Sequence, residues 1–187
     1  MKVGKKIGLI LPFTVILTLL VGCKSSDYQN ATELMKSGQY EEAQIGYAAL
    51  GDYKDASERA TMLQIKVIIE KYREFYENMD ALTIVNYDNV MSSLLSIVDE
   101  VDKIDYEKIA EYPELEEYVS KIQAVNVGIR QLVQLDRDSI SQFFEDDFYM
   151  FPSTMQLSIQ QSDSLVRSWL QMLLDMEFPY EEMLQAG

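Results

Sequence analysis

The chain has 187 residues and carries 31 acidic against 16 basic side chains, which gives a net charge of −15 at pH 7. A surface this acidic repels nucleic acid and anionic lipid, so it argues against a nucleic-acid partner. The chain contains no histidine, which excludes the usual serine and cysteine triads and zinc sites built on imidazole.

The amino-terminal residues have the order of a secretory signal. Lys2, Lys5 and Lys6 come before an apolar run over residues 7–21. That run is shorter than the roughly 20 apolar residues that cross a bilayer core. Basic residues followed by a short apolar run predict a signal peptide over residues 1–22 that is removed after export.

Leu20, Val21, Gly22 and Cys23 end this segment and resemble the lipobox of bacterial lipoproteins. The resemblance implies that Cys23 receives a diacylglyceryl group, becomes the first residue after cleavage and carries acyl chains such as palmitate. The chain would then be held by lipid at the outer face of the cytoplasmic membrane. Cys23 is the single cysteine, so the exported part forms no internal disulfide.

Removal of the signal would leave 13 of the 16 basic residues against all 31 acidic ones, a net charge of −18. Residues 23–27 are then expected to form a short tether that keeps the protein beside the membrane. The residues after the cysteine, Lys24, Ser25 and Ser26, are similar to those of Gram-positive lipoproteins. This favours an envelope of that type and leaves the number of membranes open.

A short internal repeat follows, in which residues 38–43 are echoed by residues 51–56. We expect the glycine of each copy, Gly38 and Gly51, to close a helix in a left-handed conformation. Residues 28–60 as a whole resemble part of a tetratricopeptide repeat, which implies a helical hairpin that binds peptides or proteins. No second helix pair follows at the family's period and no proline closes the unit, so one degenerate repeat or an ordinary hairpin both remain possible.

The tyrosines of this hairpin are candidates for a partner groove, although aromatic residues at helical spacing more often form the core. They are Tyr28, Tyr40, Tyr47 and Tyr53.

The rest of the chain has helical periodicity, because apolar residues recur every three or four positions. The four sets are Met62, Ile65, Ile69, Tyr72, Tyr76 and Met79; Tyr87, Val90, Leu94, Ile97, Val101 and Ile104; Leu115, Tyr118, Ile122, Val125, Ile129 and Leu132; and Ile159, Val166, Trp169, Leu173 and Met176. Polar residues and a proline predict breaks near 80–83, 102–105, 136–138 and 152–153.

These patterns predict an all-α fold without strands. Residues 61–187 would form a helical bundle with the 28–60 hairpin packed on it as one domain, and a short helical-repeat array fits the same periodicity. Gly128 lies inside the third set, where it either allows a close helix crossing or is a harmless weak point.

Two acidic clusters are the only candidates for chemistry. Glu145, Asp146 and Asp147 lie among aromatic residues, as in a carboxylate glycosidase, although a core helix with a solvated acidic face is the simpler interpretation. Residues 99–107 hold five acids but lack the glycine of an EF-hand loop, so we expect a solvated helix end and a capping aspartate.

No catalytic, cofactor or metal motif stands out, and we expect no cofactor. The sequence therefore favours a non-catalytic, membrane-anchored module that binds an envelope protein or peptide of unknown identity. A cell-wall glycosidase acting through residues 145–147 and a carrier of a small ligand between helices are the alternatives.

Overall fold

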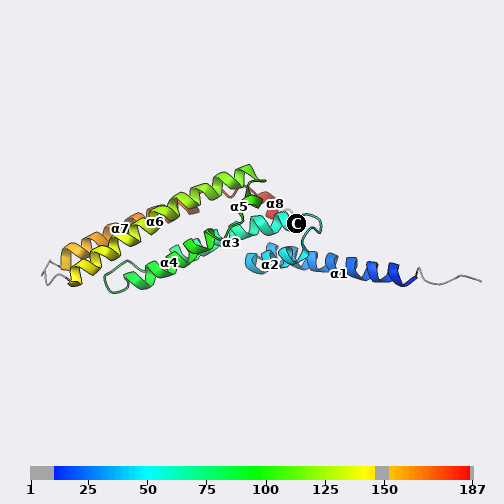
Figure 1. Ribbon diagram of the computed structural model, residues 1–187, viewed down its shortest axis with the longest axis horizontal. Coiled ribbons are helices and arrows are strands. Elements are labelled where there is room, and N and C mark those ends of the chain that lie inside the picture. Colours follow the sequence, from blue (N-terminus) through cyan, green and yellow to red (C-terminus); the bar gives the residue numbers. More distant parts are fainter. Residues whose placement is uncertain (1–10, 146–151, 186–187) are drawn as a thin grey trace, which may run out of the picture. The chain divides into compact units, whose positions relative to one another are not determined.

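The computed structural model describes residues 11–145 and 152–185. Every regular element in these ranges is a helix, which confirms the all-α prediction (Figure 1). The helices are α1 (Leu11–Lys36), α2 (Tyr40–Leu50), α3 (Ala56–Asn78), α4 (Tyr87–Val101), α5 (Tyr106–Ile109), α6 (Pro113–Glu145), α7 (Pro152–Leu174) and α8 (Glu181–Gln185).

The chain divides into two compact units. Among the described residues, the first comprises 11–63 and 182–185, and the second comprises 64–145 and 152–181. Both this boundary and the predicted border after residue 60 fall inside α3, which continues through them without a break.

In the first unit, α1 and α2 form a helical hairpin with a sharp turn at Gly38. Gly38 has φ +79°, its N–H donates to the Met35 carbonyl over 3.0 Å, and the next N–H, of Gln39, donates to Leu34 over 2.9 Å. These two bonds are a Schellman cap, so the predicted left-handed closure is confirmed.

Gly51 also has positive φ, but it acts differently. Its φ of +58° and ψ of −127° begin a tight turn in which the N–H of Tyr53 donates to the Leu50 carbonyl over 3.4 Å. Only glycine adopts this conformation without strain. The glycine closes α2 as expected, through a turn instead of a helical cap.

The expected tether over residues 23–27 lies inside α1. No glycine or proline occurs between Gly22 and Gly38, so nothing in this stretch ends the helix. The helix therefore continues through these residues instead of starting at Tyr28, and cleavage before Cys23 stays a prediction.

In the second unit, α6 lies alongside α7 and also contacts α4 and α5 (Figure 1). The predicted apolar sets supply the core, and their fully buried members include Tyr72, Leu94, Ile122 and Val166. The breaks near residues 80, 102 and 152 are confirmed by the ends of α3 and α4 and by Pro152, the first residue of α7.

The predicted break at residues 136–138 is wrong, because α6 runs without interruption from Pro113 to Glu145. Asp136 accepts a hydrogen bond from Tyr87 of α4 over 2.9 Å, and Asp138 accepts one from Gln134 over 2.8 Å. Short polar side chains end a helix when they bond to their own backbone. Here they bond to other side chains, so the helix continues.

Candidate functional site

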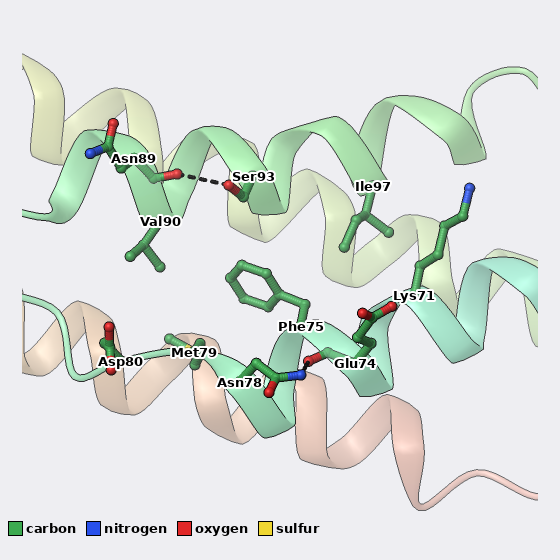
Figure 2. Close-up of a pocket in the computed structure, with 10 residues that line it drawn as sticks. All are labelled: Lys71, Glu74, Phe75, Asn78, Met79, Asp80, Asn89, Val90, Ser93 and Ile97. Atoms are coloured by element: carbon green, nitrogen blue, oxygen red, sulfur yellow. Dashed lines mark hydrogen bonds between the residues drawn. The ribbon is translucent and has the colours of Figure 1, made fainter.

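A groove lies between α3 and α4 in the second unit, with a volume of about 620 Å³ (Figure 2). We call it the α3–α4 groove. Its lining residues are Lys71, Glu74, Phe75, Asn78, Met79, Asp80, Asn89, Val90, Ser93 and Ile97.

The floor of the groove is apolar. Phe75 points from α3 into the space between the two helices, and Val90 and Ile97 point into it from α4 (Figure 2). These three side chains and Met79 are half-buried. They are sheltered by the groove walls without being covered by another element, which leaves a strip of apolar surface open to solvent.

This strip arises because α4 has two apolar faces. Its buried residues are Tyr87, Met91, Leu94, Val98 and Val101. Val90 and Ile97 are seven residues apart, about two helical turns, so they share a second face that turns toward α3. The first face packs into the core, and the second lines the groove.

The rim of the groove is polar, and two of its three charged residues are acidic. Lys71 reaches across from α3 to α4, where its Nζ lies 2.8 Å from Oε2 of Glu100. Glu74 and Asp80 are exposed, and their carboxylates have no side-chain partner among the residues that the structure describes. The groove thus offers two carboxylates whose charge is not met by a cation in the described part of the chain.

The lining residues of the groove are typical of a binding surface and do not pair a nucleophile with a base. Ser93, the single hydroxyl of the groove, donates to the Asn89 carbonyl of its own helix over 2.9 Å. No general base lies beside it among the lining residues. Across the described ranges, no three acidic or cysteine side chains are grouped as a metal site.

The structure brings together three of the four predicted groove tyrosines, in the first unit. The ring of Tyr28 packs edge-to-face against Tyr47 and Tyr53, with centroids 5.3 Å and 6.0 Å away. Tyr47 is fully buried, whereas Tyr28, Tyr40 and Tyr53 are half-buried. The cluster is part of the hairpin core, and a partner surface there stays a prediction for its half-buried members.

Polar contacts hold this tyrosine cluster in place. The hydroxyl of Tyr28 donates to Asp55, and the hydroxyls of Thr32 and Tyr47 lie 2.8 Å apart. Burial and the hydrogen bond to Asp55 raise the pKa of Tyr28 to about 12. The Nζ of Lys54 lies 4.3 Å from the centre of the Tyr28 ring.

The other predicted residues are placed as follows. Cys23 is exposed on α1. The Glu145 side chain, Asp146 and Asp147 lie outside the described residues, so the suggested carboxylate site stays a prediction. The capping aspartate expected within residues 99–107 is confirmed, since Asp105 accepts hydrogen bonds from two backbone N–H groups at the start of α5.

Comparison with protein-family models, curated proteins and solved structures gives no match. Within residues 11–145 and 152–185, no helix is both long and apolar enough to cross a membrane.

Proposed function

We propose that this chain is an exported lipoprotein, anchored through lipid on Cys23, whose helical domain binds a peptide segment of another envelope protein in the α3–α4 groove. The observation that carries the proposal is the uncovered apolar strip of Phe75, Met79, Val90 and Ile97. Apolar surface framed by polar groups is a common mark of a protein interaction site.

The proposed location depends on the sequence. A basic start, a short apolar run and the Leu-Val-Gly-Cys segment precede the domain. Two acyl chains on Cys23 provide the two attachments that stable membrane anchoring requires. The module would then work at the outer face of the cytoplasmic membrane, in a Gram-positive type of envelope.

The proposed role is non-catalytic, because the groove presents apolar side chains, amides and carboxylates without a nucleophile paired to a base. The tyrosine cluster would serve chiefly to hold the hairpin together, with Tyr28 and Tyr53 at its half-buried margin.

A small-ligand carrier is the second candidate. The volume of about 620 Å³ falls in the range of about 300–1,000 Å³ that is typical of ligand pockets. Such pockets enclose most of their ligand, whereas Glu74, Asn78, Asp80, Asn89 and Ser93 are exposed here. An open rim fits a peptide that continues beyond the groove better than an enclosed small molecule.

Site-specific photo-crosslinking in living cells tests the binding proposal. A photoreactive amino acid replaces Ser93, which lines the groove, or Ser96, which is exposed on the same helix outside it. A discrete protein adduct from position 93 alone supports the proposal. No adduct from position 93, or the same adducts from both positions, would contradict it.

The anchor is tested separately with Cys23→Ser. We expect this variant to lose acyl labelling and to leave the membrane fraction or remain unprocessed. Normal processing with unchanged membrane retention would contradict the lipid attachment.

A further inference from the structure

We propose that the partner of the α3–α4 groove is a cationic amphipathic helix, with an apolar face that enters the groove and lysine or arginine residues beside it. The inference rests on the proposed function and adds the chemistry of the ligand. It follows from the shape of the groove floor, the charges on its rim and the charge of the whole chain.

The floor has the shape that a helix requires. Its apolar residues come from two antiparallel segments: Phe75 of α3 and Met79, which directly follows α3, on one side, and Val90 and Ile97 of α4 on the other (Figure 2). Lys71 and Asn78 are seven positions apart, as are Val90 and Ile97, and each pair is therefore separated by about 10 Å along its helix axis. That length matches about two turns of a bound helix, which would offer apolar side chains at positions i, i+3 or i+4, and i+7.

The rim selects for positive charge. Lys71 is the one basic residue of the lining, and its charge is met by Glu100 at 2.8 Å. Glu74 and Asp80 are exposed and have no side-chain partner in the described part of the chain. A cationic partner would pair with both carboxylates, whereas an anionic partner would meet repulsion.

The net charge of the chain argues against two other occupants of the groove, a second copy of the chain and anionic lipid. A second copy, cleaved before Cys23, would bring a further net charge of −18 toward the same rim, and anionic lipid would be repelled in the same way. A basic segment is attracted both by the rim and by the surrounding surface, which raises its association rate at low salt.

Calorimetric titration with two designed peptides tests the inference. One peptide is an amphipathic leucine and lysine helix, and the other has the same length and apolar face with glutamate in place of lysine. The protein is the full chain in phosphatidylcholine nanodiscs, and empty nanodiscs provide the blank for peptide bound to lipid.

Two pairs of matched variants locate the binding. Glu74→Gln with Asp80→Asn removes the rim charges, and Glu111→Gln with Glu177→Gln removes two exposed charges outside the groove. Phe75→Ala removes the aromatic side chain from the groove floor. Its control, Leu165→Ala, removes an apolar side chain that is 45% exposed on α7, outside the groove. Circular dichroism checks that every variant is folded.

We expect the lysine peptide to bind in a saturable manner and the glutamate peptide not to bind. Loss of both rim charges should weaken binding about threefold to tenfold, since each exposed ion pair contributes modestly, and the remote pair should change it much less. Phe75→Ala should weaken it about tenfold or more, while Leu165→Ala leaves it unchanged. Added salt should lower the affinity.

The outcomes separate the two claims. If both peptides bind equally and Phe75→Ala abolishes both, the groove binds peptides but the preference for positive charge is wrong. If the rim pair and the remote pair weaken the lysine peptide equally, the attraction is not specific to the groove and the inference is also overturned. Binding of neither peptide would contradict both the inference and the proposed function.

Discussion

Tyr87 of α4 donates its phenolic hydrogen to Oδ2 of Asp136 on α6 over 2.9 Å, and the two side chains are only 1% and 7% exposed. Burial, the hydrogen bond and the negative charge of Asp136 hold the pKa of Tyr87 well above its usual range. A second buried bond joins Tyr72 of α3 to Asn126 of α6 over 2.7 Å. These two bonds tie α3 and α4, the two helices that line the groove, to α6.

Tyr87→Phe is predicted to destabilise the fold by about 1–3 kcal/mol, because a buried carboxylate loses its hydrogen-bond donor. Urea unfolding followed by circular dichroism measures the change. The double variant Tyr87→Phe with Asp136→Leu removes both polar groups and should recover part of the loss. A single variant as stable as the wild type would show that the bond does not hold α4.

Gly46→Ala is predicted to destabilise the hairpin of α1 and α2. A Cβ atom at position 46 would lie 3.1 Å from the Cβ of Ala31 and 3.7 Å from its Cα, and neither atom can turn aside. Overpacking costs about 1–3 kcal/mol, which should exceed the gain of up to about 1 kcal/mol from replacing glycine within a helix. The measurement is thermal unfolding, and a raised melting temperature would refute the close packing of these helices.

At Gly128 the neighbour can move, so the expected result differs. The sequence left open whether Gly128 allows a close helix crossing or is a harmless weak point. The structure shows a close approach, because the Trp169 ring of α7 lies 3.3 Å from the position of an added Cβ. We expect Gly128→Ala to be nearly neutral and Gly128→Leu to displace the half-buried ring. Trp169 is the single tryptophan, so a shift of fluorescence to longer wavelength reports the displacement. Unchanged emission from the leucine variant would contradict the contact.

The stability of the first unit should depend on pH through the ionisation of Asp55. Burial raises the pKa of Asp55, but hydrogen bonds from Tyr28 and Arg59 and the charge of Arg59 outweigh burial and hold the pKa below its usual value. Because the pKa is lower in the folded state, the carboxylate stabilises the fold above its unfolded pKa of about 4. This contribution is lost as the pH falls through the lower, folded-state pKa.

Asp55→Asn should therefore be less stable than the wild type at neutral pH, and its stability should decline less steeply below about pH 4. Urea unfolding at a series of pH values gives the two curves. The control is Asp52→Asn, which replaces an exposed aspartate nearby in the sequence. Parallel curves for wild type and Asp55→Asn would show that the contacts with Tyr28 and Arg59 do not stabilise the fold.

Much of the fold could be predicted because helical periodicity depends on spacing alone. Leu115, Ile122 and Ile129 step along one face of α6 and are all fully buried, as the pattern requires. The break at residues 136–138 could not be judged in the same way. The helix continues there because Asp136 bonds to Tyr87, which lies 49 positions earlier in the sequence, and no local pattern reveals that partner.

The groove was missed for a related reason. Val90 and Ile97 belong to the same periodic set as Tyr87, Leu94 and Val101, and the sequence does not show that two faces of one helix meet different surroundings. Only the placement of α6 separates the buried face from the open one. For the tyrosine cluster the spacing was more informative, since it grouped residues that do come together and favoured a place in the core, but it did not separate the buried Tyr47 from the half-buried Tyr28 and Tyr53.

Hydrogen–deuterium exchange of the full chain in phosphatidylcholine nanodiscs, with and without the leucine and lysine helix, tests whether the α3–α4 groove is the binding site. We expect slower exchange of backbone amides in residues 71–80 and 89–97 when the peptide is bound, with little change in α7. Slower exchange confined to the hairpin of α1 and α2 or to α7, with the groove unchanged, would contradict the claim that the α3–α4 groove is the binding site.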